Sequence, residues 1–220
     1  MLRTGTHTGK IGTAAEYLQV DPNNVYIGRL DGTGSPVGSS QIKLDFGAVA
    51  AVECIVYSSA PQDPLANKPP ICLIGAHSSH VYEIRAGVVG VAVASPLETG
   101  QTASRVTCGF IGDASVGPTV KLGAGLAVAT LVVNSGNCDA RCALTTVNEY
   151  GGVLVIDTTD TFTTLSVCGG VCYPNDFGSL GTVRARGGLI DFTQSDASRT
   201  VTTMEFYRGG SMNWSEDSTR

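Results

Sequence analysis

The stretch Ser166–Pro174, SVCGGVCYP, contains a Gly-Gly pair that recurs along the second half of the chain. Such pairs stand at positions 151–152, 169–170, 187–188 and 209–210, so their spacing is nearly regular. Self-similarity with a period of about 20 residues is typical of architectures that stack one structural unit on the next. The repeat therefore indicates the fold more strongly than any single motif does.

Alignment on the second Gly of each pair gives two apolar columns that flank a mixed one. The apolar columns hold Leu154, Cys172, Ile190 and Met212, and then Ile156, Pro174, Phe192 and Trp214, whereas the mixed column holds Val155, Tyr173, Asp191 and Asn213. Upstream of the pairs, Leu165 and Val167 align with Val183 and Ala185, Met204 and Phe206 align after a one-residue insertion, and Glu149 falls in an apolar column. A period of two is typical of strands with one face on a core.

These columns predict an all-β protein whose residues 86–220 form a right-handed β-helix, or β-solenoid, with coils of about 18–22 residues. Each coil would bury its inward residues only against the coils on either side of it. Glycine suits the corners, where the backbone needs positive φ or has no room for a Cβ atom. The alternative is an antiparallel sandwich or meander with Gly-rich turns.

Residues 1–85 are predicted to form an N-terminal β-rich block that anchors the protein or caps the solenoid. Its strand candidates are Asn23–Leu30, Gln41–Gly47, Val52–Tyr57, Ile71–Ala76 and His80–Ala86, and its only helical hint is short, at residues 12–20. We expect the other end, after the last repeat, to need cover from residues 211–220 or from another chain, because open solenoid ends expose unpaired strand groups.

The amino-acid composition argues against a nucleic-acid partner and a membrane partner. Charged residues make up only 15% of the chain, Gly contributes 28 residues, and the net charge is −5. Lys and Arg are scattered, so the basic patch that a nucleic-acid partner requires is not expected. The longest apolar run, Val88–Ala94, is too short to cross a bilayer, and the first residues lack the apolar region of a secretory signal. No membrane partner is expected.

The seven cysteines include two Cys-x3-Cys pairs, Cys138 with Cys142 and Cys168 with Cys172. If the pairs lay on adjacent coils, four thiolates would suit zinc, and a disulfide is a second alternative. An odd number of cysteines argues against a full disulfide framework. Because Cys172 shares its column with apolar residues, burial in the core as a small hydrophobic side chain is the favoured interpretation.

Three further motifs are interpreted as loops or turns. Gly5–Ile11, GTHTGKI, departs from the phosphate-binding loop in spacing and lacks a preceding strand. Gly123–Gly125 is a fragment of a dinucleotide fingerprint without its third glycine. His77 and His80 offer two imidazoles at a predicted turn with no third metal ligand nearby.

Acidic and hydroxyl side chains are the remaining candidates for functional clusters. Asp157, Asp160, Asp176 and Asp196 would form a glycosidase-like cluster if their turns stacked, but Asp is also a common turn residue. Asp191 lies in the mixed column, whose other members are not acidic. Threonine is frequent in residues 157–165, yet no Thr-x-Thr motif recurs at one column, which argues against an ice-binding face. The sequence therefore predicts no catalytic, cofactor-binding or metal-binding residue.

The runs TFTTLSVCGGVCY, GTVRARGGLIDF and SRTVTTMEFYRGGSMNW resemble the Gly/Thr/Val-rich β-solenoid structural proteins of tailed bacteriophages and prophages. The segments VYEIRAGVVGVAV and GDASVGPTVKLGAG are similar to the lead-in coils of that family. The resemblance covers about residues 80–220, and the cysteine content departs from it. It implies a virion component, such as a capsid decoration or cement protein or another head- or tail-associated part.

We therefore expect a non-enzymatic virion protein that assembles through its N-terminal block and its solenoid flanks. Its expected partners are two further copies in a homotrimer and the major capsid protein or another virion protein, with no cofactor and no small-molecule substrate. The alternative is a phage receptor-binding or carbohydrate-active β-helix of the polysaccharide lyase or depolymerase kind.

Overall fold

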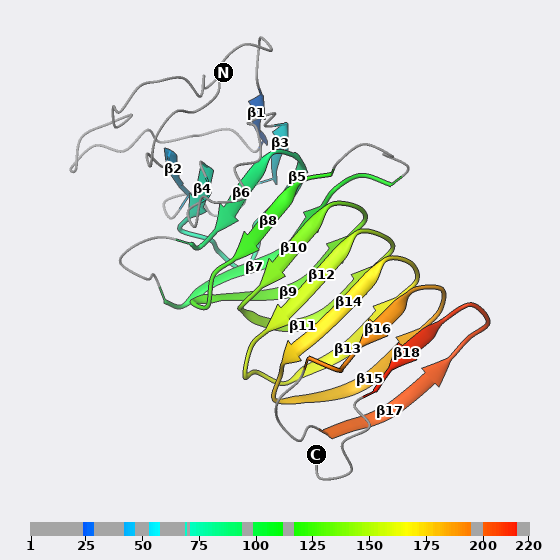
Figure 1. Ribbon diagram of the computed structural model, residues 1–220. Coiled ribbons are helices and arrows are strands. Elements are labelled where there is room, and N and C mark those ends of the chain that lie inside the picture. The colour runs from blue at the N-terminus through cyan, green and yellow to red at the C-terminus, as the bar shows by residue number, and fades with distance from the viewer. Residues whose placement is uncertain are drawn as a thin grey trace.

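The computed structural model describes residues 24–28, 42–46, 53–57, 69, 71–93, 99–111, 117–194 and 200–214. Over these residues the protein is all-β and contains no helix, and its strands build two nine-stranded sheets that face each other along one solenoid (Figure 1). Every pair of neighbouring strands is parallel, as the ladders Leu154↔Cys172 and Leu165↔Val183 illustrate. The predicted β-solenoid is confirmed, and the antiparallel sandwich is excluded.

Consecutive strands alternate between the two sheets, so each coil supplies one strand to each sheet. One sheet has the order β1 (Asn24–Gly28), β3 (Glu53–Tyr57), β5 (Val81–Ala86), β7 (Gln101–Cys108), β9 (Leu126–Val133), β11 (Ala143–Glu149), β13 (Phe162–Val167), β15 (Ser179–Ala185) and β17 (Thr200–Phe206). The other has β2 (Ile42–Asp45), β4 (Ile71–Ile74), β6 (Val88–Val91), β8 (Thr119–Leu122), β10 (Asn137–Ala140), β12 (Val153–Asp157), β14 (Val171–Asp176), β16 (Leu189–Asp191) and β18 (Ser211–Asn213).

The five strand candidates of the N-terminal block are all strands, β1 to β5. They belong to the same two sheets as the later coils, and the boundary expected after residue 85 falls at the end of β5, between strands that continue those sheets. The helical hint at residues 12–20 lies outside the described residues. The anchoring or capping role of residues 1–85 stays a prediction.

Coil length varies because the loops between strands differ. Thr146, Thr164 and Thr182 are register partners at the spacing of the Gly-Gly pairs, and Thr203 follows Thr182 after a slightly longer coil. The coil from Arg105 to its partner Thr130 is longer still, whereas the coil from Thr130 to Thr146 is shorter than those that follow. The predicted coil length of about 18–22 residues therefore describes the coils after Thr146.

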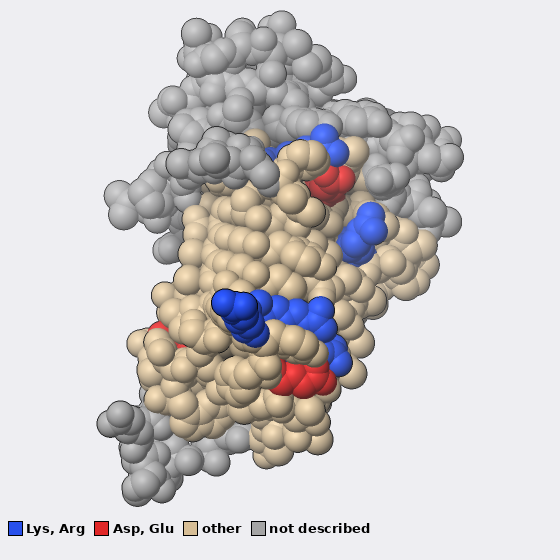
Figure 2. Space-filling view, turned by 90° about the vertical axis from the view of Figure 1, so that its right-hand side faces the viewer, with Lys and Arg blue, Asp and Glu red and all other residues tan. Residues whose placement is uncertain are grey.

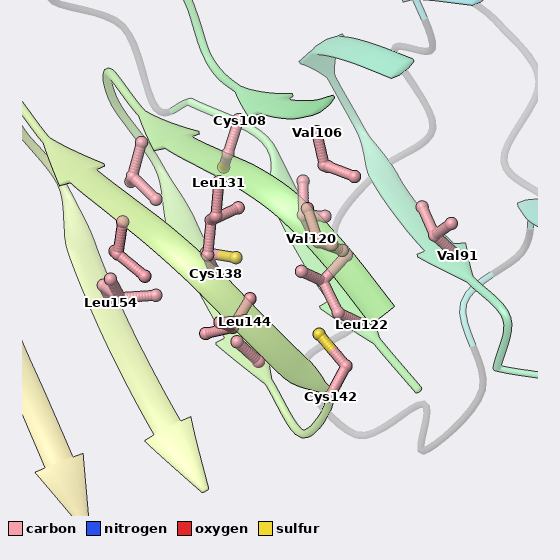
Figure 3. Close-up of a cluster of buried hydrophobic side chains, with 14 of the residues drawn as sticks. Val91, Val106, Cys108, Val120, Leu122, Leu131, Cys138, Cys142, Leu144 and Leu154 are labelled. Carbon is pink, nitrogen blue, oxygen red and sulfur yellow. The ribbon is translucent and has the colours of Figure 1, made fainter. Parts of the chain in front are cut away.

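The core lies between the sheets and is built from the columns that the repeat predicts. Leu154, Cys172, Ile190 and Met212 are register partners on β12, β14, β16 and β18. Figure 3 shows the same packing in earlier coils, where side chains such as Val120, Leu131 and Leu144 fill the interior from both sheets. A second ladder of rings, Phe162, Phe177, Phe192 and Trp214, runs along the stack, with centroid separations of 6.4, 5.9 and 4.8 Å.

Stacked turns explain the Gly-Gly pairs. Gly170 has φ +78, and a Cβ atom there would lie 2.6 Å from the Gly152 carbonyl oxygen of the preceding coil. Gly152 has φ +86 and meets Gly136 in the same way. The turn before Gly210 contains one additional residue, which accounts for the insertion needed to align Met204 and Phe206. The corner interpretation of the repeat is thus confirmed at atomic level.

Candidate functional site

The two Cys-x3-Cys pairs do not converge. Cys138 lies on β10 and Cys172 on β14, and the strand β12 separates them. None of the seven cysteines forms a disulfide, and only Cys168 reaches the surface, where it is half-buried in a turn. Within the described residues, no group of three His, Cys, Asp or Glu side chains is placed to hold a metal ion.

Burial also works against thiolate chemistry in these pairs. Cys172 is fully buried, and burial raises the pKa of its thiol well above the usual range. Burial raises the pKa of Cys142 to about 12. A hydrogen bond with the Cys108 thiol, together with burial, raises the pKa of Cys138. Because metals and electrophiles require the thiolate, these side chains act as core groups, as Figure 3 illustrates for Cys108, Cys138 and Cys142.

The His77–His80 segment forms the predicted turn, but its two imidazoles are in different environments. His77 is exposed, whereas His80 is fully buried. The backbone N–H of His77 donates to Nδ1 of His80 at 3.1 Å, and Tyr82 Oη lies 3.0 Å from the same nitrogen. His80 thus has structural partners in the turn and the first core coils. Gly123–Gly125 forms the turn between β8 and β9, and Gly5–Ile11 lies outside the described residues.

The aspartates are only partly brought together. Asp157 and Asp176 are register partners on β12 and β14, so their Cα atoms lie on neighbouring strands. Asp160 accepts a hydrogen bond from the Thr158 hydroxyl at 3.0 Å. Asp191 lies further along the stack, where a hydrogen bond from the Thr193 hydroxyl lowers the pKa of its carboxyl. A lowered pKa is the opposite of what a general acid needs, and Asp196 lies outside the described residues.

Five threonines form a column across one sheet, and the sequence did not predict this column. Thr130, Thr146, Thr164, Thr182 and Thr203 are consecutive register partners on five strands. The column recurs without a Thr-x-Thr motif, and its only signal in the sequence is a threonine spacing that the unequal loops make irregular. Threonine is β-branched and packs well beside itself across strands. The column therefore stabilises the sheet.

One carboxyl group is buried in the described core. Glu149 is fully buried on β11, in the apolar column where its register partners are Val133 and Val167. Neither of its carboxyl oxygens makes a hydrogen bond of ordinary geometry. Burial raises the pKa of Glu149 to about 8, and the nearby Val171 amide and Cys172 thiol offset only part of this rise. The carboxyl is consequently protonated at neutral pH.

The last coil is the part of the described surface that most clearly lacks a neighbour. Among the strands that the structure describes, β17 pairs only with β15 and β18 only with β16, so each described sheet ends there with a strand edge. In one inward column the exposed fraction rises from 0% at Leu165 and 2% at Val183 to 37% at Met204. Phe206 and Trp214 are 57% and 50% exposed. We call Val201, Met204, Phe206, Met212 and Trp214, with the edges of β17 and β18, the open C-terminal coil.

Polar groups surround the open C-terminal coil on its outer side. Arg184 Nε donates to Glu205 Oε2 at 2.8 Å, and the guanidinium of Arg186 lies 4.8 Å from the centroid of the Tyr207 ring. Figure 2 shows charged side chains in two groups on one face of the molecule, one in its upper half and one in its lower half, toward the C-terminal end. An apolar centre with a polar rim is typical of protein interfaces.

No protein-family model, no curated protein and no solved structure matches the chain. The described residues include no helix that is long and apolar enough to cross a membrane. The candidate site is thus defined by its geometry alone.

Proposed function

We propose that this protein is a non-enzymatic structural component of a bacteriophage virion, such as a capsid decoration or cement protein or another head- or tail-associated part. The observation that carries an assembling role is the open C-terminal coil, because its core-facing side chains, Met204, Phe206 and Trp214, are exposed to solvent. Large apolar side chains exposed together mark sites of association. The virion context rests on the pattern resemblance of residues 80–220.

The same proposal includes a homotrimer formed through the solenoid flanks, alongside binding to the major capsid protein or another virion protein. Phe110, Ile111 and Tyr150 support lateral contacts, because they are 54%, 68% and 50% exposed away from the last coil. Cyclic packing of three parallel solenoids would bury such flanks on every copy. Light scattering of the purified protein should then give a mass that is a multiple of three chains, and a monodisperse monomer would contradict the trimer.

Quantitative mass spectrometry of purified phage particles tests the virion role. We expect the chain in a fixed copy number relative to the major capsid protein, retained through washing and density-gradient purification. Its presence in infected cells but absence from particles would contradict the proposal.

A receptor-binding or carbohydrate-active β-helix is the second candidate, and the adjacent positions of Asp157 and Asp176 favour it. Paired carboxylates are the usual catalytic groups of glycosidases. Release of reducing sugar from a bacterial surface polysaccharide, lost in Asp157→Asn, would support this candidate over the structural one.

A further inference from the structure

We propose that the open C-terminal coil binds the same coil of a second copy, so that two solenoids join end to end about a twofold axis. The inference rests on the proposed function as an assembling protein, and it names the partner of one surface. It concerns the ends of the solenoid, and it holds whatever number of copies associates through the flanks.

The open C-terminal coil exposes apolar side chains that belong to the core columns. Met204 and Phe206 occupy columns that are buried in every earlier described coil from β9 onward, and these columns are apolar except for the carboxyl of Glu149, which is also buried. The ring ladder likewise ends in Trp214, which packs on Phe192 at 4.8 Å and leaves half of its surface exposed. One more layer of apolar side chains would complete both columns.

The open C-terminal coil also presents two strand edges. β17 and β18 are the last strands of different sheets, and the exposed core lies between them. A single peptide strand from a partner would extend only one sheet and leave the other edge and much of the core open. A partner that presents two edges with apolar side chains between them satisfies both sheets, and the end of another β-solenoid has this form.

The same end of an identical chain is the partner that matches this surface. At the N-terminal end, the described side chains of Leu44 and Phe46 are 5% and 0% exposed, so they offer no apolar surface to match. A twofold contact brings Met204, Phe206 and Trp214 of both copies together, and it closes at two copies.

In this arrangement the twofold axis makes β17 of one copy antiparallel to β17 of the second copy, and likewise for β18. Backbone groups at both free edges then gain hydrogen-bond partners. The polar rim formed by the Arg184–Glu205 pair and the Arg186–Tyr207 contact stays at the outside of the joint. The contact therefore has the apolar centre and polar periphery of a specific interface.

Sedimentation equilibrium of the full chain tests the end-to-end contact. The wild type should have twice the mass of Phe206→Glu at the same concentration, because a carboxylate in the middle of the joint would be desolvated without a partner. Thr163→Glu is the matched control, since it adds the same charge at an exposed strand position on β13, away from the end, and it should keep the wild-type mass.

Trp214 supplies a second measurement, because it is the only tryptophan in the chain and lies on the proposed joint. Its fluorescence should shift to longer wavelength on dilution of the wild type and should already be shifted in Phe206→Glu at every concentration. Circular dichroism checks that the variant is folded, and Met204→Lys provides a second disruption of the same surface.

Equal masses for the wild type and the folded Phe206→Glu and Met204→Lys variants would overturn the inference. So would growth of the wild type into open-ended filaments, since that requires contact between unlike ends, or Trp214 emission that does not change with concentration. None of these results depends on particle composition, so the end-to-end contact and the virion role fail separately.

Discussion

At the scale of single residues, Glu149 is the clearest departure from the repeat. Its column is otherwise apolar in the neighbouring coils, and the carboxyl lies near Gly170 and Cys172 with no charged partner among the groups that influence it. Removing a carboxylate from water without a partner is costly, so the folded state holds the acid in its neutral form. The residue therefore links stability to pH.

The linkage has a definite sign. The pKa of Glu149 rises from 4.5 to about 8 on folding, so between these pH values the folded chain binds a proton that the unfolded chain releases. Stability from this group is complete below pH ~4.5 and falls as the pH rises toward ~8, by on the order of a few kcal/mol. Glu149→Gln should remove most of this slope in urea titrations at pH 5 and pH 8.

Glu205→Gln is the control for that titration. Its side chain is half-buried, and the hydrogen bond from Arg184 holds the pKa of Glu205 below its usual range. It titrates below the window from pH 5 to pH 8, so this variant should keep the wild-type slope. A slope that survives in Glu149→Gln would show that another group causes it.

At the scale of elements, the turns between the two sheets set the sequence repeat. Successive turns stack closely enough that a Cβ atom at Gly169 would lie 2.5 Å from the Tyr150 carbonyl oxygen, and one at Gly187 would lie 2.6 Å from that of Cys168. Positive φ is a separate requirement, met at Gly152 and Gly170. Glycine recurs because stacking and dihedral angle both exclude larger residues there.

Two glycines separate these requirements. Gly170 has φ +78, and a Cβ atom there would lie 2.6 Å from the Gly152 carbonyl oxygen and 2.8 Å from Glu149 Oε1. Gly100 has φ +75, but a Cβ atom there would have no described atom within 4 Å. We expect Gly100→Ala to lose about 1–2 kcal/mol from the dihedral alone. Gly170→Ala should lose about 1–3 kcal/mol more from the clash. Equal losses in thermal or urea unfolding would contradict the stacking explanation.

At the scale of the whole molecule, stability depends on neighbouring coils, and the last coil has a neighbour on one side only. Leu165 and Met204 belong to the same inward column, two coils apart, yet their exposed fractions are 0% and 37%. A residue buried by coils on both sides gains from each contact. The open C-terminal coil should accordingly be the first to fray in the separated chain.

Alanine substitutions measure this gradient. Leu165→Ala should destabilise the protein by about 2–5 kcal/mol, as is usual for a fully buried leucine. Met204→Ala should lose less than about 1 kcal/mol at low protein concentration, because its side chain is already partly hydrated. If the ends pair as proposed, the loss at Met204 should increase with protein concentration, while that at Leu165 stays constant. Equal losses at low concentration would show that the last coil is already covered.

Much of the fold was predictable because every repeating coil has glycine at its corners and apolar residues in the same columns. The Gly-Gly corners, the Leu154–Cys172–Ile190–Met212 column and the burial of Cys172 all follow from alternation within one coil and recurrence between coils. Glu149 was placed in an apolar column from the sequence alone. These features depend on local geometry, which is the same in each coil and so leaves a periodic signal.

Tertiary structure alone decided which coils meet and which side chains the end of the stack exposes. The sequence did not place β1 to β5 in the same sheets as the later strands. The segments that connect these strands are long and unequal, so no regular spacing is visible there. The threonine column depends on register across loops of unequal length. The sequence predicted an end after the last repeat that needs cover, but it did not predict the exposure of Met204 and Phe206, which belong to columns whose other described members are buried from β9 onward. Both side chains are exposed because no described coil packs on the last one, and this exposure makes them a candidate surface for assembly.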